Sequence, residues 1–114
     1  MQVSVIGNPD DTLVVTVRGD LTDGSDTVLG TTLDQVLDRP VPRVVVDVSG
    51  IDFCDSTGLR SFVTGHVRAH AAGGWLRLAA PGDRLLDLLD LTGLTARLDV
   101  YPTVADAIST GPDL

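Results

Sequence analysis

The sequence predicts an α/β domain built on a mostly parallel sheet of about five strands, with about four helices. Segments with strand composition alternate with segments that repeat apolar residues at helical spacing. This order is typical of parallel strands joined by right-handed crossovers. The near-continuous apolar run R-V-V-V-D-V at residues 43–48 indicates a central strand covered on both faces. Only a turn at residues 8–11 separates the first two strands, so we expect these two strands to be antiparallel.

The amino-terminal half contains two strands and a helix before the central strand. Residues 2–6 alternate between polar and apolar, and residues 12–18 are rich in β-branched side chains. Ser25 or Asp26 is expected to cap the helix, because a side-chain oxygen there accepts a hydrogen bond from a free backbone N–H. The helix then carries four apolar residues at helical spacing and ends at two prolines: Leu29, Leu33, Val36, Leu37, Pro40 and Pro42.

The carboxyl-terminal half alternates helices and strands. The motif D-S-T-G-L at residues 55–59 starts a helix that Gly73 and Gly74 end. Thr103 and Asp106 are spaced like a capping box before a short final helix, with Asp in place of the usual Glu. Between these helices we expect a strand at residues 75–79, a leucine-rich helix at 81–91 and a strand at 97–101.

The composition indicates a single folded domain over residues 1–114, with its core at about residues 3–108. The formal net charge is −8, and Asp and Arg are the only charged residue types besides His. Negative charge of this size repels phosphate backbones, so we expect no direct binding of nucleic acid. The charge is compatible with a basic protein partner or with solubility alone.

The cysteine content, the first residues and the lengths of the apolar runs predict a soluble, cytoplasmic protein that does not contact a membrane. Cys54 is the only cysteine, so it cannot form an internal disulfide, and this fits a reducing compartment. Met1 leads directly into a strand rather than into a signal peptide, and no apolar run is long enough to span a membrane.

Polar residues follow two strands of the predicted sheet. In open parallel sheets, binding sites form beyond the carboxyl ends of the strands. Two loops are expected at such ends, at residues 19–24 and 49–56. If their strands are neighbours, four carboxylates surround the hydroxyl group of Ser56. These are the carboxylates of Asp20, Asp23, Asp52 and Asp55.

Three enzymatic or ligand-binding interpretations of this cluster fail on chemistry or geometry. A phosphorylatable aspartate needs a lysine to pair with the phosphate, and the chain has no lysine. A serine hydrolase needs a base beside Ser56, but the two histidines, His66 and His70, lie about 15–20 Å further along the same helix. A nucleotide phosphate at the helix start would be repelled by the acids. We therefore expect no enzymatic activity and no cofactor.

His66 and His70 also have the spacing of some zinc sites, four residues apart on a helix. No third ligand is evident near them, so we expect a partly buried side of the helix and no metal. Cys54 is expected to be a small buried residue.

Two interpretations of Ser56 remain open from the residues alone. The serine either caps the helix, or it is a hydroxyl that another protein modifies. Gly58 has no side chain, so a partner could approach the first turn closely. Phosphorylation would add a charge of about −1.5 to −2 there, which the helix dipole favours and the neighbouring Asp side chains oppose.

The motif D-S-T-G-L after V-V-V-D-V-S-G-I-D-F-C resembles the STAS domains of bacterial anti-sigma factor antagonists. Supporting features run from Val3 to Ile108 and include G-D-L-T after the second strand and A-A-G-G-W-L-R-L at the fourth. The resemblance implies that an anti-sigma factor, itself an ATP-dependent serine kinase, phosphorylates Ser56, with Thr57 as the alternative acceptor. The unphosphorylated protein would bind the anti-sigma factor and free the sigma factor, and the phosphorylated protein would not bind. A PP2C-type phosphatase would restore the unphosphorylated form.

The resemblance also implies a partner-binding surface around the motif. The family often has an acid at the fourth position of its G-x-L-x loop, where this chain has Thr22, followed by Asp23. A STAS scaffold that binds its partner constitutively is the alternative, since D-S-T-G can also persist as a helix cap. The implied surface consists of Asp20, Thr22, Asp23, Asp52, Asp55, Ser56, Thr57 and Gly58.

Overall fold

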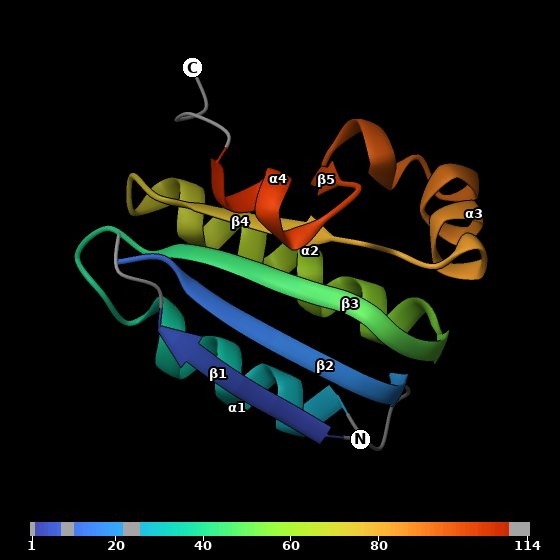
Figure 1. Cartoon of the computed structure of the whole chain (residues 1–114), viewed down its shortest axis with the longest axis horizontal. Coiled ribbons are helices and arrows are strands. Elements are labelled where there is room, and N and C mark those ends of the chain that lie inside the picture. Colours follow the sequence, from blue (N-terminus) through green and yellow to red (C-terminus); the bar gives the residue numbers. More distant parts are fainter. Residues whose placement is uncertain (1, 8–10, 22–25, 110–114) are drawn as a thin grey trace.

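A computed structural model describes residues 2–7, 11–21 and 26–109 of the chain. Its strands form one sheet in the order β1-β2-β3-β4-β5 (Figure 1). The strands are β1 (Gln2–Gly7), β2 (Leu13–Leu21), β3 (Arg43–Cys54), β4 (Trp75–Ala79) and β5 (Asp99–Tyr101). The helices are α1 (Asp26–Leu37), α2 (Ser56–Ala71), α3 (Asp83–Leu91), the 3-10 turn η1 (Leu94–Ala96) and α4 (Val104–Ser109).

The topology confirms the predicted fold class. β1 pairs with β2 in the antiparallel direction, and every other pair in the sheet is parallel. Each crossover steps to the next strand in the same direction, and right-handed crossovers of this kind place their helices on one face. Accordingly α1, α2 and α3 contribute to one apolar cluster, while α4 packs on the opposite face (Figure 1).

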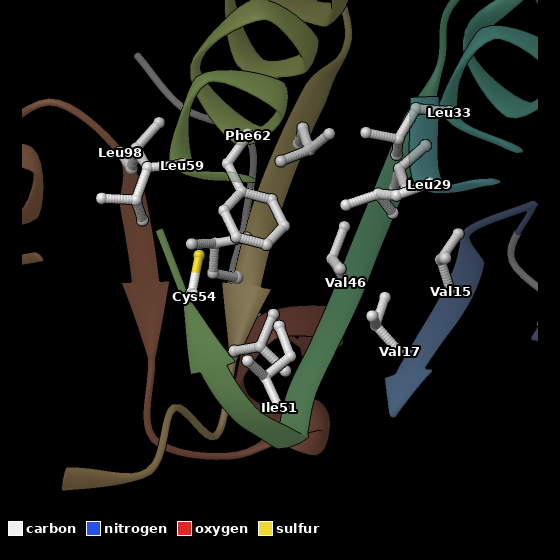
Figure 2. Packing of buried hydrophobic residues seen from close by; sticks show 14 of the residues in the cluster. Val15, Val17, Leu29, Leu33, Val46, Ile51, Cys54, Leu59, Phe62 and Leu98 are labelled. Carbon is white, nitrogen blue, oxygen red and sulfur yellow. The ribbon is translucent and has the colours of Figure 1, made fainter. Parts of the chain in front are cut away.

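The two apolar clusters meet at the central strand, β3. Val44 and Val46 are fully buried in the larger cluster together with Phe62 of α2 (Figure 2). Val45 lies between them on the other face and is fully buried in the smaller cluster with Ala107 of α4. The prediction of a central strand covered on both faces is therefore confirmed for this part of β3.

A charged side chain that the sequence did not single out lies inside the smaller cluster. Arg77 of β4 is fully buried, and its Nη1 donates a hydrogen bond to the carbonyl oxygen of Ala107 at 2.8 Å. Its guanidinium carbon lies 3.8 Å from the ring centroid of Trp75 and 5.3 Å from that of Tyr101. Because Ala107 belongs to the last turn of α4, where carbonyl groups lack helical partners, Arg77 fastens this helix to the sheet.

The strands β2 and β3 extend further than expected. The prediction of loops was wrong for residues 19–21 and 49–54, which are strand and stay paired through Leu21 and Cys54. Their ladder has register shifts between Thr16 and Arg18 and between Gly19 and Asp20. Gly50, Ile51, Phe53 and Cys54 stay in the sheet because they pair with β2, which overrides the turn-forming preference of this stretch. Ser49 and Asp52 fall at the register shifts, and the N–H of Ser49 donates to Asp47 Oδ1 at 3.0 Å.

Smaller differences concern element ends. The helix expected from residue 81 begins at Asp83, and the last strand is shortened to 99–101 by the preceding η1 turn. Asp106 N–H donates to Thr103 Oγ1 at 3.0 Å, which confirms the predicted cap of α4. Helix α1 begins at Asp26, and Ser25, the other expected cap, lies outside the described residues.

Candidate functional site

Helix α2 begins where β3 ends, and Asp55 makes the junction. Asp55 has an extended backbone (φ −98°, ψ −178°), and its Oδ1 accepts a hydrogen bond from the N–H of Gly58 at 2.9 Å. Its carbonyl oxygen accepts from the N–H of Leu59 at 3.0 Å, the first bond of the helical ladder. Asp55 is thus the N-cap, and Ser56 is the first residue of the helix. The interpretation of Ser56 as the cap is therefore wrong.

The first turn of α2 is anchored from inside the protein. Leu59 is 4% exposed and belongs to the larger apolar cluster, as does Leu98 (Figure 2). Gly58 is also buried, and its N–H serves the cap. Gly58 therefore does not offer the open surface that we expected a partner to approach. The glycine instead lies on the buried side of the first turn of α2.

The predicted acidic residues gather beside this turn. β2 and β3 are neighbours, as expected, and Asp20 pairs across the ladder with Phe53. Asp20 and Asp52 are exposed, while Asp55 is half-buried in its capping position. Thr22 and Asp23 lie outside the described residues, so the ring of four carboxylates stays a prediction.

An exposed aromatic residue and a pocket adjoin these acids, and the sequence analysis missed both. The side chain of Phe53 is 53% exposed. It lines a pocket of about 330 Å³ between the end of β3 and helix α3, which also contains Arg84. The other lining residues are Ile51, Asp52, Cys54, Leu85 and Leu88.

The exposure of Phe53 follows from a break in the alternation of β3. Ile51 and Cys54 are both buried in the larger cluster although they are three residues apart. The strand curves at Ile51 (Figure 2), so both Asp52 and Phe53 between them are exposed. A regular strand would have placed one of these two side chains inside. The sequence offers a weak signal here, because Phe53 stands in the acidic stretch D-F-C-D.

The remaining candidate residues lie where the sequence placed them. His66 is half-buried and His70 exposed on α2, with ring centroids 6.0 Å apart. The described residues include no group of three or more His, Cys, Asp or Glu side chains that could hold a metal ion. Cys54 is buried, as expected, and forms no disulfide. No helix among residues 2–7, 11–21 and 26–109 is long and apolar enough to cross a membrane.

Comparisons with solved structures show the same fold in proteins of distant sequence. A structure described as a candidate anti-sigma factor antagonist from Thermotoga maritima superposes with a TM-score of 0.85 at 19% identity, covering 93% of this chain and 91% of that one. An anti-sigma factor antagonist from Mycobacterium paratuberculosis gives 0.80 at 24% identity, with coverages of 95% and 92%. The Bacillus cell fate determinant SpoIIAA in its phosphorylated form gives 0.72 at 16% identity, with coverages of 94% and 96%.

The sequence itself matches a family model over most of its length. Residues 4–101 match the model described as "Mlab, STAS domain". A search of the curated proteins finds no significant match. The matched segment runs from β1 to the end of β5 and includes the D-S-T-G motif at the start of α2. The chain therefore belongs to the STAS domain family, as the resemblance of its sequence had indicated.

Proposed function

We propose that this STAS domain is an anti-sigma factor antagonist that is switched off by phosphorylation at Ser56. The unphosphorylated form binds an anti-sigma factor that is also a serine kinase, and this binding frees a sigma factor. Phosphorylation abolishes the binding, and a PP2C-type phosphatase restores it. The domain is thus the substrate and the switch, and the catalyst is its partner.

The observation that carries this proposal is the position of Ser56. It is the first residue of α2, directly after the cap, and the cap is made by Asp55. Capping therefore gives no reason for a serine at this position. The helix start lies at the end of β3 beside the exposed Phe53, which provides an apolar contact for a partner. The shared fold with anti-sigma factor antagonists supports the same function, and one of them, SpoIIAA, has been solved in an unphosphorylated and a phosphorylated form.

Electrostatics explain how one phosphate could release the partner without a change of fold. Phosphorylation adds a charge of about −1.5 to −2. The site already contains Asp20, Asp52 and Asp55, so a partner that fits these acids would meet additional negative charge in a close contact. In a contact that is packed closely around the serine hydroxyl, the volume of the phosphate and the desolvation of its charge cost several kcal/mol, and about 2.7 kcal/mol already weakens binding a hundredfold. Thr22, Asp23 and Thr57 complete the surface that we propose for the partner.

The test begins with identification of the kinase. Affinity capture with the parent chain and with Ser56→Asp as baits should retain the anti-sigma factor on the parent bait alone. With the captured kinase and ATP, the parent chain and Thr57→Ala should each accept one phosphate, and Ser56→Ala should accept none. Labelling of Ser56→Ala to the parent level would show that the modified residue is not Ser56.

A constitutive STAS scaffold is the second candidate function. The description of the matching family model names a STAS domain without naming an antagonist, so family membership alone does not require a switch. On this alternative, Ser56→Asp binds the partner as tightly as the parent chain does. Measured dissociation constants that differ by less than threefold would favour the scaffold over the switch.

A further inference from the structure

We propose that Arg60 binds the phosphate group once Ser56 is phosphorylated. The inference rests on the proposed function, because it concerns the phosphorylated form of the same site. It assigns to Arg60 the role of a positioning residue that holds the phosphoserine against the first turns of α2.

Helix geometry places Arg60 within reach of the phosphate. Ser56 and Arg60 are four residues apart in α2, the spacing at which residues of a helix are neighbours on its surface. Side chains on a helix lean toward its amino terminus, so a long side chain at position 60 extends back over the turn that contains position 56. An anionic group four residues before a cation is also the favourable order for such a pair.

Arg60 is available for this contact. Its side chain is exposed, and it forms no hydrogen bond or ion pair with any residue that the structure describes. It lines the groove between α1 and α2, and Asp34 is the acid among the described residues that line this groove. Asp34 is already engaged by Arg68, whose Nη1 lies 2.6 Å from Asp34 Oδ1. The guanidinium of Arg60 therefore remains free of the acid on the neighbouring helix.

The charges around the site leave few other partners for a phosphate. Asp20 and Asp52 are exposed at the adjoining strand ends and would repel it. Helix α2 contains no acidic residue from Ser56 to Ala71, and Arg60 is its first cation. Asp55 is committed to the N–H of Gly58, so a phosphate held by Arg60 can coexist with the cap.

Arg84 is the competing cation. It is exposed on α3 and lines the pocket with Asp52 and Phe53. Its own helix also carries Asp83 next to it and Asp87 three residues later, where an i, i+3 pair can form. These acids offset the positive charge of Arg84, whereas α2 offers none to Arg60. The comparison favours Arg60, and the experiment includes both arginines.

The test uses the full chain with phosphoserine incorporated at position 56 during translation, without kinase or anti-sigma factor. A ³¹P NMR titration measures the second pKa of the phosphate, which is about 6 for an isolated phosphoserine. A nearby guanidinium favours the dianion and lowers this pKa. Arg60→Gln should therefore raise it by roughly 0.3 relative to the phosphorylated parent. Asp20, Asp52 and Asp55 are the same in both proteins, so their effect cancels in the difference.

The matched control is Arg43→Gln. Arg43 is exposed at the opposite end of β3 and has no ion pair among the described residues, so its replacement should leave the phosphate pKa unchanged. A shift below 0.1 for Arg60→Gln, or a larger shift for Arg84→Gln, would overturn the assignment to Arg60. The proposed function fails on a different result, namely a partner that binds the phosphorylated and unphosphorylated chains equally well.

Discussion

The carboxylate of Asp55 lies 2.9 Å from the backbone nitrogen of Gly58, and this hydrogen bond sets the start of helix α2. It also shows that capping of the helix belongs to Asp55, and not to Ser56, the proposed phosphorylation site in the same motif. Asp55 stabilises the helix, and Ser56, the next residue, is not needed for that purpose. The stability of this segment and the proposed phosphorylation at Ser56 can therefore be tested by separate substitutions.

Replacement of Asp55 should destabilise the protein, and replacement of Ser56 should not. Asp55→Ala removes the acceptor for Gly58 N–H and should lower the free energy of unfolding by about 1 kcal/mol. Asp55→Asn keeps an acceptor oxygen and should lower the free energy of unfolding by less than Asp55→Ala does. Ser56→Ala should change stability by less than about 0.5 kcal/mol. Urea unfolding followed by circular dichroism measures all three, and an equal loss for Ser56→Ala and Asp55→Ala would contradict the assignment of the cap.

The alternation of strands and helices could be predicted because the helices carry apolar residues at helical spacing and the strands are rich in β-branched residues. The run at residues 44–46 is apolar on both faces because α1 and α2 cover one face and α4 the other. The cap could not be assigned, because Asp and Ser are both good N-cap residues. The choice between them depends on where β3 ends and on which residue of the first turn enters the core. Leu59 is that residue, and its burial fixes which side of α2 faces the core.

The extension of β3 could not be predicted, because its cause is tertiary. Ser49, Gly50 and Asp52 are turn-forming residues, yet β2 continues beside this stretch and pairs with Gly50, Ile51, Phe53 and Cys54, which keeps it in the sheet. Gly50 allows the close approach: a Cβ atom there would lie 2.7 Å from Arg18 Cγ and 3.0 Å from the carbonyl oxygen of Val17. The glycine thus serves strand packing at a register shift and not a turn. The exposure of Phe53 follows from the same curvature.

Arg77 should hold α4 on the sheet. Arg77→Met fills part of the same volume but removes the hydrogen bond to Ala107 and the charge stacked on Trp75. We expect a loss of about 2–3 kcal/mol in the free energy of unfolding, because a hydrogen bond from a charged group contributes this much and leaves a buried carbonyl unpaired when removed. Arg77→Lys should recover a part of this lost stability, because lysine keeps the positive charge. The recovery should be incomplete, because lysine lacks the planar guanidinium.

The location of this effect can be checked by hydrogen exchange. Amides of residues 104–109 should exchange faster in Arg77→Met, while amides in the middle of α2 should change only as the global stability does. Unchanged relative protection of α4 would show that its apolar contacts hold it without Arg77.

The two glycines after α2 should differ in their tolerance of alanine. Both end the helix, as predicted, but for separate reasons. Gly73 has a φ of +82° with open space around it, so Gly73→Ala should cost about 1–2 kcal/mol in backbone strain. At Gly74 a Cβ atom would lie 1.7 Å from the carbonyl oxygen of Pro42, which accepts a hydrogen bond from Trp75 N–H. Gly74→Ala should therefore cost more than about 3 kcal/mol. Thermal unfolding of the two variants would test this, and equal losses would argue against the backbone contact.

Phe53 should contribute to partner binding much more than to folding. Its side chain is 53% exposed beside the start of α2, so Phe53→Ala should lower the stability of the free protein by less than about 1 kcal/mol. An exposed aromatic residue at the centre of an interface is a typical hot spot, and its removal should weaken binding of the anti-sigma factor by about 2 kcal/mol, or roughly thirtyfold.

The matched control for Phe53 is Leu91→Ala. Leu91 is 85% exposed at the end of α3, so its replacement also removes an exposed apolar side chain but should leave the affinity within twofold of the parent. Calorimetric titration with the captured anti-sigma factor measures both variants. If Leu91→Ala weakens binding as much as Phe53→Ala does, the contact surface is not centred on the end of β3. If only Phe53→Ala weakens binding, the partner covers the surface next to Ser56, where an added phosphate would lie in the contact.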